Sequence, residues 1–418
     1  MAEATAPEHI DLVVFSSLFP SAARPAAGLF IRERMFRVAR QRPLVVVSPQ
    51  PWFPGQALIR RWRPDYRPHA PALEVQQGIR VYHPRFLSFP GVLRGLDGWS
   101  MACCSYGLLR RLKQQGARLI DAHFAYPDGE AATRLGRWLE LPVTITLRGT
   151  EVPHSRNPAL RPRLARALRC ATRVFAVSDS LRRLALELGT PAERTEVVGN
   201  GVDVARFHPV DRHEARVRFG LPADAQVLIT VGGLVERKGM HRVIDCLPAL
   251  LVRHPALHYL VVGSGGPEGD KRAELDAQVA RLGLAGRVHF TGAVAPDELK
   301  WPLSASDVFV LSTRNEGWAN VFLEAMACGL PVVATDVGGN AEVVCRAELG
   351  SIVPFGDAAA LTAALDSALD KPWDRAAILA YAEANQWDKR VAQLLHAFAP
   401  MLAESGAASE SIAVPTRK

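Results

Sequence analysis

Residues 308–335 constrain the fold more than any other stretch, because they form a complete strand–loop–helix–strand pattern. Val308–Leu311 and Val332–Thr335 are short apolar runs of the kind that form buried parallel strands. A polar turn at 312–317 and a short helical pattern separate them. In an open parallel sheet, such a turn lies at the carboxyl ends of the strands, where α/β proteins bind their ligands. The stretch therefore predicts an α/β fold with a ligand site at this edge.

The helix within this stretch is predicted to run over residues 321–328. Asn320 is its expected N-cap, Gly329 suits the position after the last turn, and Pro331 prevents continuation. The first N–H groups of a helix have no partner inside the helix, and the helix dipole strengthens their attraction for anions. We therefore expect the backbone N–H groups of residues 318–321 to face an anionic ligand.

Two carboxylates, Glu316 in the turn and Glu324 in the helix, stand eight positions apart. At helical rise this spacing spans at most about 12 Å, which is comparable to the reach from a sugar ring to a ribose across a diphosphate. Such a spacing is common by chance, and an ordinary helix with a solvated glutamate is the simple alternative. The whole string N-E-G-W-A-N-V-F-L-E-A-M-A-C-G, however, resembles the E-x7-E signature of the GT-B glycosyltransferases of family four, the retaining group.

A chain of 418 residues is too long for one ordinary core and suits two domains. The sequence has no apolar run of 18 residues, so no membrane-spanning helix is expected. Residues 1–9 lack the basic and apolar regions of a secretory signal. The six cysteines lack C-x-x-C spacing, which favours reduced thiols in the cytoplasm over disulfides or a zinc site.

The charge of the chain is unevenly distributed. Residues 1–205 carry 29 Lys and Arg against 17 Asp and Glu, a net charge of +12, whereas residues 206–418 carry 21 against 25, a net charge of −4. This asymmetry predicts an anionic partner for the first half. The sequence contains no nucleic-acid-binding motif that we recognise, so anionic lipid or a phosphate-linked acceptor fits better.

Two basic, aromatic stretches at 49–72 and 85–111 suggest where such a partner would bind. Amphipathic basic segments lie on membrane surfaces in many peripheral proteins. A helix packed on its own domain, with a solvated basic face, explains the second stretch equally well. Both interpretations stay open at this point.

In the first half, several predicted strands end in polar residues. Strands are expected at 11–15, 44–48, 119–123, 143–147 and 174–177, and His123 and Arg148 stand where two of them meet their loops. The strings A-H-F-A-Y-P-D-G at 122–129 and T-L-R-G-T-E at 146–151 look like those of family-four enzymes of the teichuronic-acid and exopolysaccharide type. Gly28, before a predicted helix, is either a simple loop glycine or a point where backbone approaches a ligand.

The second half repeats the α/β alternation, with strands expected at 227–231, 258–262 and 288–291 before the central stretch. The string N-G-V-D at 200–203 resembles the end of the N-terminal domain in the same family. The glycine-rich loop 263–268 places Glu268 where a dinucleotide-binding G-x-G-x-x-G motif needs its last glycine. A nicotinamide-dependent enzyme is therefore a poor interpretation.

The resemblance implies the fold class α/β, GT-B, with two Rossmann-like domains and an interdomain cleft. The expected domains are an acceptor-binding domain at 1–205, joined by a C-terminal helix at 387–403, and a nucleotide-sugar-binding domain at 206–386. The Ala/Ser-rich segment 404–418 is expected to be a disordered tail.

The resemblance also implies catalytic roles for four residues. Glu316 would hold hydroxyls of the donor sugar, His123 would face the anomeric centre, and Arg237 and Lys238 would neutralise the diphosphate leaving group. Glu324 would accept hydrogen bonds from the ribose. The full set of donor-binding candidates is Gly28, Arg148, Gly233, Gly263, Gly317, Trp318, Ala319, Asn320, Val321 and Glu324.

One position departs from the family pattern. The family often has arginine where this chain has Gly233, so one expected phosphate contact is missing, and Arg237 or Arg148 is expected to replace it. The sequence contains no Asp-x-Asp pair. We therefore expect neither a metal ion nor another cofactor, and cationic side chains must stabilise the leaving group.

The predicted function is retaining transfer of a sugar from a UDP- or GDP-sugar to a glycan or polyprenyl-diphosphate-linked acceptor, in exopolysaccharide or other cell-surface polysaccharide biosynthesis. The expected location is the cytoplasm, with contact to the anionic inner face of the membrane. A GT-B sugar phosphorylase or sugar-phosphate synthase, which would use the same cleft, is the alternative enzyme. A non-catalytic nucleotide-sugar-binding scaffold is the alternative from another class.

Overall fold

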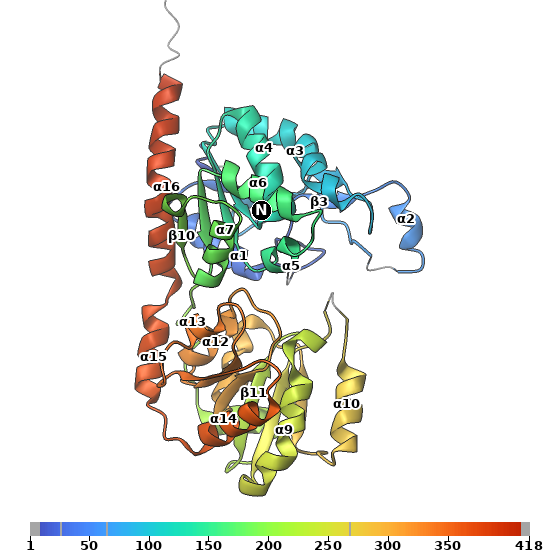
Figure 1. Cartoon of the computed structure of the whole chain (residues 1–418), viewed down its shortest axis with the longest axis vertical. Helices are drawn as coiled ribbons and strands as arrows, with labels where there is room; N and C mark the ends of the chain where they lie inside the picture. Colours follow the sequence, from blue (N-terminus) through green and yellow to red (C-terminus); the bar gives the residue numbers. More distant parts are fainter. Residues whose placement is uncertain (1–8, 26, 64–65, 267–268, 411–418) are drawn as a thin grey trace, which may run out of the picture. The chain divides into compact units, whose positions relative to one another are not determined.

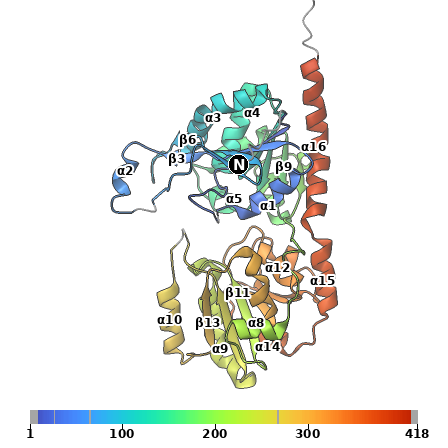
Figure 2. The same ribbon diagram turned by 180° about the vertical axis from the view of Figure 1, so that it is seen from behind.

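The computed structural model describes residues 9–25, 27–63, 66–266 and 269–410 (Figures 1 and 2). The chain divides into two compact units. The first comprises Met1–Gly199 with Arg390–Lys418, and the second comprises Asn200–Lys389. Residues 404–410 of the expected disordered tail belong to helix α16 (Trp387–Glu410). Residues 411–418 of that tail, like residues 1–8, lie outside the described part of the chain.

The described residues of the first unit form an eight-stranded sheet in the order β10-β9-β8-β7-β1-β2-β5-β4. Its strands are β1 (Leu12–Phe15), β2 (Leu44–Val47), β4 (Leu73–Gln76), β5 (Ile79–Tyr82), β7 (Leu119–His123), β8 (Val143–Leu147), β9 (Arg173–Ala176) and β10 (Thr195–Val197). All neighbours are parallel except β4 and β5. The five strands predicted for this half are confirmed to within one residue at each end.

The antiparallel β4–β5 hairpin was not predicted. Its two-residue turn, Gln77–Gly78, has positive φ at both positions (50° and 82°), which is the type I′ geometry that matches strand twist. Leu73 and Val75 of β4 are exposed. An edge strand with exposed apolar residues lacks the buried-strand pattern by which the other strands were recognised.

Helices cover the first sheet (Figure 1). They are α1 (Leu29–Val38), α3 (Asp97–Gln114), α4 (Glu130–Leu139), α5 (Glu151–Ser155), α6 (Arg161–Cys170), α7 (Asp179–Glu187) and α16, whereas α2 (Gln56–Ile59) lies away from the sheet. In the basic, aromatic stretches, β3 (Gln50–Trp52) pairs with β6 (Arg85–Leu87) in a small parallel sheet. The described residues of the first stretch therefore include β3 and α2, and those of the second include β6 and most of α3.

Helix α16 belongs to the first unit from Arg390 onward. Val391, Leu394 and Phe398 are buried in the same hydrophobic cluster as β1 and β2. The Phe398 ring packs edge-on against Phe175 of β9, with centroids 6.0 Å apart. The C-terminal helix thus completes the core of a unit whose other segment, Met1–Gly199, comes from the opposite end of the chain.

The boundary between the units differs by a few residues from the expected one. The N–H of Val202 donates to the carbonyl of Asn385 (3.1 Å), and the N–H of Trp387 donates to the carbonyl of Val202 (3.2 Å). A Cβ on Gly201 would lie 2.6 Å from the backbone of Trp387. Residues 200–205 therefore belong to the second unit, since the Val202 backbone is bonded to Asn385 and to Trp387, the first residue of α16.

The described residues of the second unit form a six-stranded parallel sheet in the order β13-β12-β11-β14-β15-β16. Its strands are β11 (Gln226–Val231), β12 (Leu257–Val262), β13 (Val288–Gly292), β14 (Val308–Leu311), β15 (Val332–Thr335) and β16 (Gly350–Val353). Its helices are α8 (Arg212–Arg218), α9 (Met240–Arg253), α10 (Arg272–Arg281), α11 (Lys300–Ser304), α12 (Asn320–Ala327), α13 (Asn340–Val343), α14 (Ala358–Asp370) and α15 (Arg375–Ala384). The predicted strands are again confirmed to within one residue, and β16 was not predicted.

The central strand–loop–helix–strand unit is β14, α12 and β15. Gly329 has φ of 80° and follows the helix, with Leu330 N–H bonded to the Ala325 carbonyl (3.0 Å), so the predicted C-terminal stop is confirmed. The predicted N-cap is wrong, because Ala319 precedes the helix and the Asn320 side chain accepts a hydrogen bond from Asn200 Nδ2 (2.8 Å). A tertiary partner has taken the oxygen that would cap the helix.

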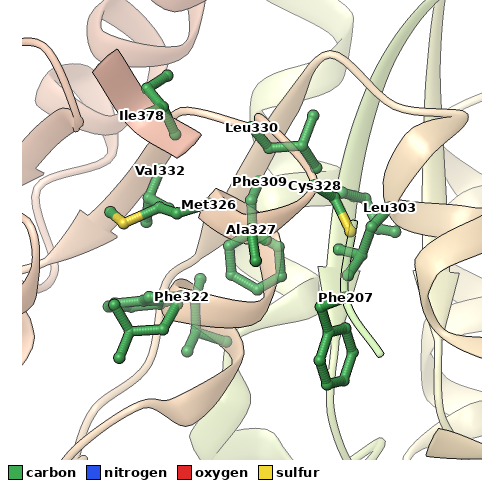
Figure 3. Close-up of a cluster of buried hydrophobic side chains, with 14 of the residues drawn as sticks. Phe207, Leu303, Phe309, Phe322, Met326, Ala327, Cys328, Leu330, Val332 and Ile378 are labelled. Carbon is green, nitrogen blue, oxygen red and sulfur yellow. The ribbon is translucent and has the colours of Figure 1, made fainter. Parts of the chain in front are cut away.

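Helix α12 is anchored to the sheet by its apolar face (Figure 3). Phe322 and Met326 have no exposed surface, and the Phe322 ring packs edge-on against Phe309 of β14 at 5.8 Å. Burying a side chain of this size is worth about 1.5–3 kcal/mol. The helix start, where the candidate donor site lies, is therefore held rigidly on the sheet.

Candidate active site

A basic–acidic cluster lies where β11 and β14 meet their loops. Lys238 Nζ is 2.5 Å from Glu316 Oε1, and Arg237 Nη1 is 3.4 Å from the same oxygen. The Thr313 hydroxyl donates to that oxygen as well (3.3 Å). The side chains of Lys238 and Glu316 are 17% and 11% exposed, so solvent screens the pair only partly. The structure thus brings together three of the four predicted catalytic residues.

The loops that carry this cluster touch through their backbones. Gly338 has φ of 56°, and a Cβ there would lie 1.6 Å from the Glu316 carbonyl oxygen. Gly239 has φ of 79°, and a Cβ there would lie 1.9 Å from the Ser312 carbonyl oxygen. Only glycine fits such contacts. Neither glycine was among the predicted site residues, although a glycine flanking each loop is the signal that could have indicated them.

Two predicted donor-site glycines have different environments. Gly263 has φ of 147°, and a Cβ there would lie 1.9 Å from the Gly232 carbonyl oxygen, so this position requires glycine. A Cβ on Gly233 would meet only the Ser264 carbonyl oxygen, at an ordinary 3.7 Å. Position 233 therefore has room for a side chain, and the missing arginine is not a steric requirement of this fold.

The chain from Gly317 to Val321 leads into α12, as predicted. Ala319 is buried, and Gly317, Trp318, Asn320 and Val321 are partly buried. The indole Nε1 of Trp318 is buried without a hydrogen-bond partner in the described part of the chain. A buried indole N–H without a partner is unusual.

Glu324 lies partly exposed in the middle of α12. Burial first and the Glu324 charge second raise the pKa of Cys328 to about 12. The Glu324 carboxylate is therefore close enough to Cys328 to raise the pKa of its thiol. It also stays partly exposed, which its predicted hydrogen bonds to a ribose require.

The fourth predicted catalytic residue, His123, is fully buried in the first unit. Its Nδ1 lies 3.1 Å from both Nε and Nη2 of Arg148, and its Nε2 lies 3.5 Å from Asp121 Oδ2. Burial lowers the pKa of His123 well below its ordinary value, and the charges of Arg148 and Arg34 lower it further. His123 is therefore neutral at physiological pH.

The T-L-R-G-T-E string forms a tight turn after β8. Glu151 Oε2 accepts hydrogen bonds from the backbone N–H groups of Arg148 (3.1 Å) and Gly149 (2.8 Å), and its Oε1 accepts one from Ala125 N–H (2.9 Å). The Arg148 guanidinium lies over the Phe30 ring at 5.0 Å. This turn therefore fixes Arg148 beside His123 on the neighbouring strand.

Two buried carboxyl groups accompany this cluster. Burial raises the pKa of Asp121 to about 6, although a hydrogen bond from Thr144 and the charges of Arg34 and Arg148 oppose the shift. Burial also raises the pKa of Asp128 to about 7, against hydrogen bonds from the backbone and hydroxyl of Ser17. Sequence analysis missed both residues, since neither stands in a spacing that suggests catalysis.

Gly28 precedes α1 with φ of 67°, and a Cβ there would lie 2.4 Å from the Leu18 carbonyl oxygen. The contact with Leu18 is sufficient to explain glycine at this position. The predicted site residues thus form two groups. Gly28, His123 and Arg148 belong to the first unit, and the others belong to the second.

Among the described residues, one group of His, Asp, Glu or Cys has ligand atoms close enough to hold a metal ion: His254, Asp366 and Asp370. Arg253 already forms ion pairs with both aspartates. These residues lie on α14 and at the end of α9, apart from the Glu316 cluster. No helix in the described ranges has the length and apolar character needed to cross a membrane.

Two Rossmann-like units, with glycine-constrained loops and a cationic cluster at the strand ends of the second, are features of a nucleotide-sugar-dependent GT-B enzyme. Residues 211–400 match the family described as Glycosyl transferases group 1, and residues 61–206 match Glycosyltransferase Family 4. The chain is a family-four glycosyltransferase of the retaining group, and it uses a nucleotide-sugar donor.

Two relatives illustrate the range of the family. TuaC of Bacillus subtilis, a glycosyltransferase ascribed to teichuronic acid biosynthesis, is 30% identical over 341 residues, which cover 79% of this chain and 82% of TuaC. The GDP-mannose-dependent alpha-(1-6)-phosphatidylinositol monomannoside mannosyltransferase of Mycolicibacterium smegmatis is 35% identical over 268 residues, covering 60% of this chain and 68% of that protein.

Solved structures agree on the fold. HepE of Anabaena in complex with UDP has a TM-score of 0.71 at 20% identity, covering 94% of this chain and 100% of HepE. Sucrose-phosphate synthase from Thermosynechococcus elongatus has a TM-score of 0.76 at 21% identity, with the same coverage. The predicted GT-B fold class and enzyme family are therefore confirmed.

Proposed function

We propose that this enzyme transfers a sugar, with retention, from a UDP- or GDP-sugar to a glycan or polyprenyl-diphosphate-linked acceptor during cell-surface polysaccharide biosynthesis. The similarity to TuaC, along most of both chains, supports the polysaccharide role. The proposed sugar transfer is supported above all by the Lys238–Glu316–Arg237 cluster, which lies at the strand ends of the second sheet.

In this proposal each member of the cluster has a distinct role. Lys238 and Arg237 neutralise the diphosphate as the glycosidic bond breaks, because the two cations exceed the single negative charge of Glu316. Glu316 holds the Lys238 ammonium in place through its Oε1 and offers Oε2 to hydroxyls of the donor sugar. Charge-assisted hydrogen bonds of this kind are worth about 1.5–3 kcal/mol each.

The remaining donor contacts follow the order of the chain. The N–H groups at the start of α12, near Trp318 to Val321, contact the sugar and phosphate, and Glu324 accepts hydrogen bonds from the ribose. Gly263 lets the loop after β12 pack against the loop after β11 without a side chain between them. The cationic side chains carry the leaving-group charge in place of a metal ion.

The test is a screen of UDP- and GDP-sugars by thermal shift, followed by mass analysis of products formed with polyprenyl-diphosphate-linked glycans. Release of UDP or GDP with growth of the glycan by one sugar is expected. With a sugar phosphate supplied as acceptor, its glycosylation would identify a synthase instead, and phosphate-dependent formation of a sugar 1-phosphate would identify a phosphorylase. Tight nucleotide-sugar binding without turnover on any acceptor would indicate a scaffold.

The acceptor side is proposed to meet the anionic inner face of the cytoplasmic membrane. More than half of the large apolar side chains exposed in the described residues lie in the two basic, aromatic stretches: Leu58, Trp62, Leu87, Val92, Leu93, Leu96, Trp99 and Tyr106. Trp62 and Trp99 are 78% and 51% exposed. Each basic residue near an anionic surface adds about 1 kcal/mol before screening by salt.

Liposome sedimentation tests the membrane contact. The enzyme is expected to sediment with vesicles containing anionic lipid at low salt, and much less with neutral vesicles or at high salt. The double variant Trp62→Ala/Trp99→Ala should lose most of this binding, whereas Val252→Ala, which removes an exposed apolar side chain of the second unit, should keep it. Failure of the unaltered enzyme to sediment with anionic vesicles would refute the proposal.

A further inference from the structure

The contact between His123 and Arg148 determines where the imidazole carries its proton. An arginine guanidinium has N–H donors and no acceptor. Two of its nitrogens, Nε and Nη2, lie 3.1 Å from Nδ1 of His123. Nδ1 must therefore present its lone pair to Arg148, since a proton there would oppose the N–H donors of the guanidinium.

A neutral imidazole whose Nδ1 accepts carries its single proton on Nε2. Here Nε2 faces Asp121 Oδ2 at 3.5 Å. Neither of these two buried atoms has a hydrogen-bond partner that meets the geometric criteria within the described residues. The proton on Nε2 thus points toward a carboxylate oxygen that attracts it, which favours the same tautomer.

We infer that Arg148 is a positioning residue that locks His123 as the neutral Nε2–H tautomer, so that Nδ1 cannot act as a proton acceptor in the transfer reaction. The tautomer follows from the geometry alone. The part that concerns the reaction rests on the proposed function.

The residues that hold Arg148 and the nearby charge of Arg34 also favour the neutral Nε2–H tautomer of His123. Arg148 comes from the turn after β8, where Glu151 holds its backbone and Phe30 of α1 covers its guanidinium. Arg34 of α1 adds a second buried positive charge, and it is itself held by the carbonyls of Val198 (2.7 Å) and Gly199 (2.8 Å). Protonating His123 would place a third cation beside two buried guanidinium groups.

This inference changes the role expected for Arg148. It was a candidate to replace the phosphate-binding arginine that is absent at Gly233. Its guanidinium instead faces a buried histidine and an aromatic ring. Neutralisation of the diphosphate is then left to Arg237 and Lys238, and Arg148 should affect turnover through His123 without affecting nucleotide affinity.

The tautomer is tested by two-bond proton–nitrogen NMR on the full chain labelled with ¹⁵N-histidine. The His123 signal is identified as the one absent from His123→Gln. In the unaltered enzyme we expect the Nε2–H pattern, unchanged from about pH 8 to about pH 7, a range that lies above the pKa of about 6 of the neighbouring Asp121. Arg148→Lys, which keeps a donor, should retain the pattern, whereas Arg148→Met should give a tautomer mixture or a titrating imidazole. An Nδ1–H pattern or ordinary titration in the unaltered enzyme would overturn the inference.

The second arm separates positioning from phosphate binding. Arg148→Met should lower kcat about tenfold or more, while calorimetry with UDP and GDP gives affinities within about twofold of the unaltered enzyme. Arg156→Met, an exposed arginine eight residues away, is the matched control and should change neither quantity. A loss of nucleotide affinity confined to Arg148→Met would mean that Arg148 binds phosphate after all. If the unaltered enzyme binds no nucleotide, the proposed function fails while the NMR result still decides the tautomer.

Discussion

Replacing Lys238 by alanine removes the closest cation to Glu316. The Lys238 ammonium lies 2.5 Å from Glu316 Oε1, and both side chains are mostly buried. Water therefore does not fully replace the interaction that the substitution removes. Arg237 and Thr313 stay near that oxygen, at 3.4 Å and 3.3 Å. Glu316 should therefore keep its position while the cluster loses half of its positive charge.

The effect on turnover follows from the change in charge during the reaction. The leaving nucleoside diphosphate gains negative charge as the glycosidic bond breaks, so a contact with Lys238 strengthens in the transition state. A charge-assisted hydrogen bond worth about 1.5–3 kcal/mol corresponds to a rate loss of about ten- to a hundredfold or more, at 1.36 kcal/mol per tenfold. The loss should appear in kcat at saturating donor.

The assay is nucleotide release at saturating donor and acceptor. Lys238→Arg keeps the charge and should retain more activity than Lys238→Ala, and Lys389→Ala is the control for loss of an exposed lysine. Unchanged kcat in Lys238→Ala would refute the argument and make Lys238 a bystander charge. Activity lost in the variant but restored by magnesium would instead reveal a metal role.

Three further predictions concern the second unit. Glu316→Gln should nearly abolish transfer with little effect on nucleotide affinity, whereas Glu324→Ala should weaken nucleotide binding. Equal losses of nucleotide affinity in the two variants, measured by calorimetry, would contradict these separate roles. Gly338→Ala should lower kcat by up to about a hundredfold, because the added Cβ displaces the Glu316 backbone. Gly233→Ala should retain activity, because a Cβ at position 233 meets no close contact. Asn200→Ala should weaken nucleotide affinity about fivefold, because it removes the hydrogen bond that Asn200 Nδ2 donates to Asn320 of α12, and Asn200→Asp, which lacks this donor, should not recover the affinity.

The strands could be predicted from the sequence because most of them are buried in parallel sheets. Such strands are continuous apolar runs, as in Val308–Leu311 and Val332–Thr335, and little else in a chain has that appearance. The β4–β5 hairpin and β16 were missed for the same reason. Their residues are partly exposed, so the apolar run that marks a buried strand is absent.

The N-cap of α12 shows where local preference failed. Asn320 stands at the right place for a cap, and asparagine is among the best capping residues. Its oxygen is instead bonded to Asn200, which lies 120 residues away in the chain. A short-range preference worth about 1 kcal/mol is easily exchanged for a tertiary hydrogen bond of similar strength.

By itself, the sequence determined the identity and chain position of the candidate site residues, because each follows a recognisable strand end or belongs to a specific string. The tertiary structure alone decided which of them meet. Lys238 reaches Glu316 across 78 positions, and Arg148 reaches His123 across 25. These pairings depend on how closely neighbouring backbones approach, as at Gly338 against Glu316, and such distances are set by the packing of the whole sheet and its loops.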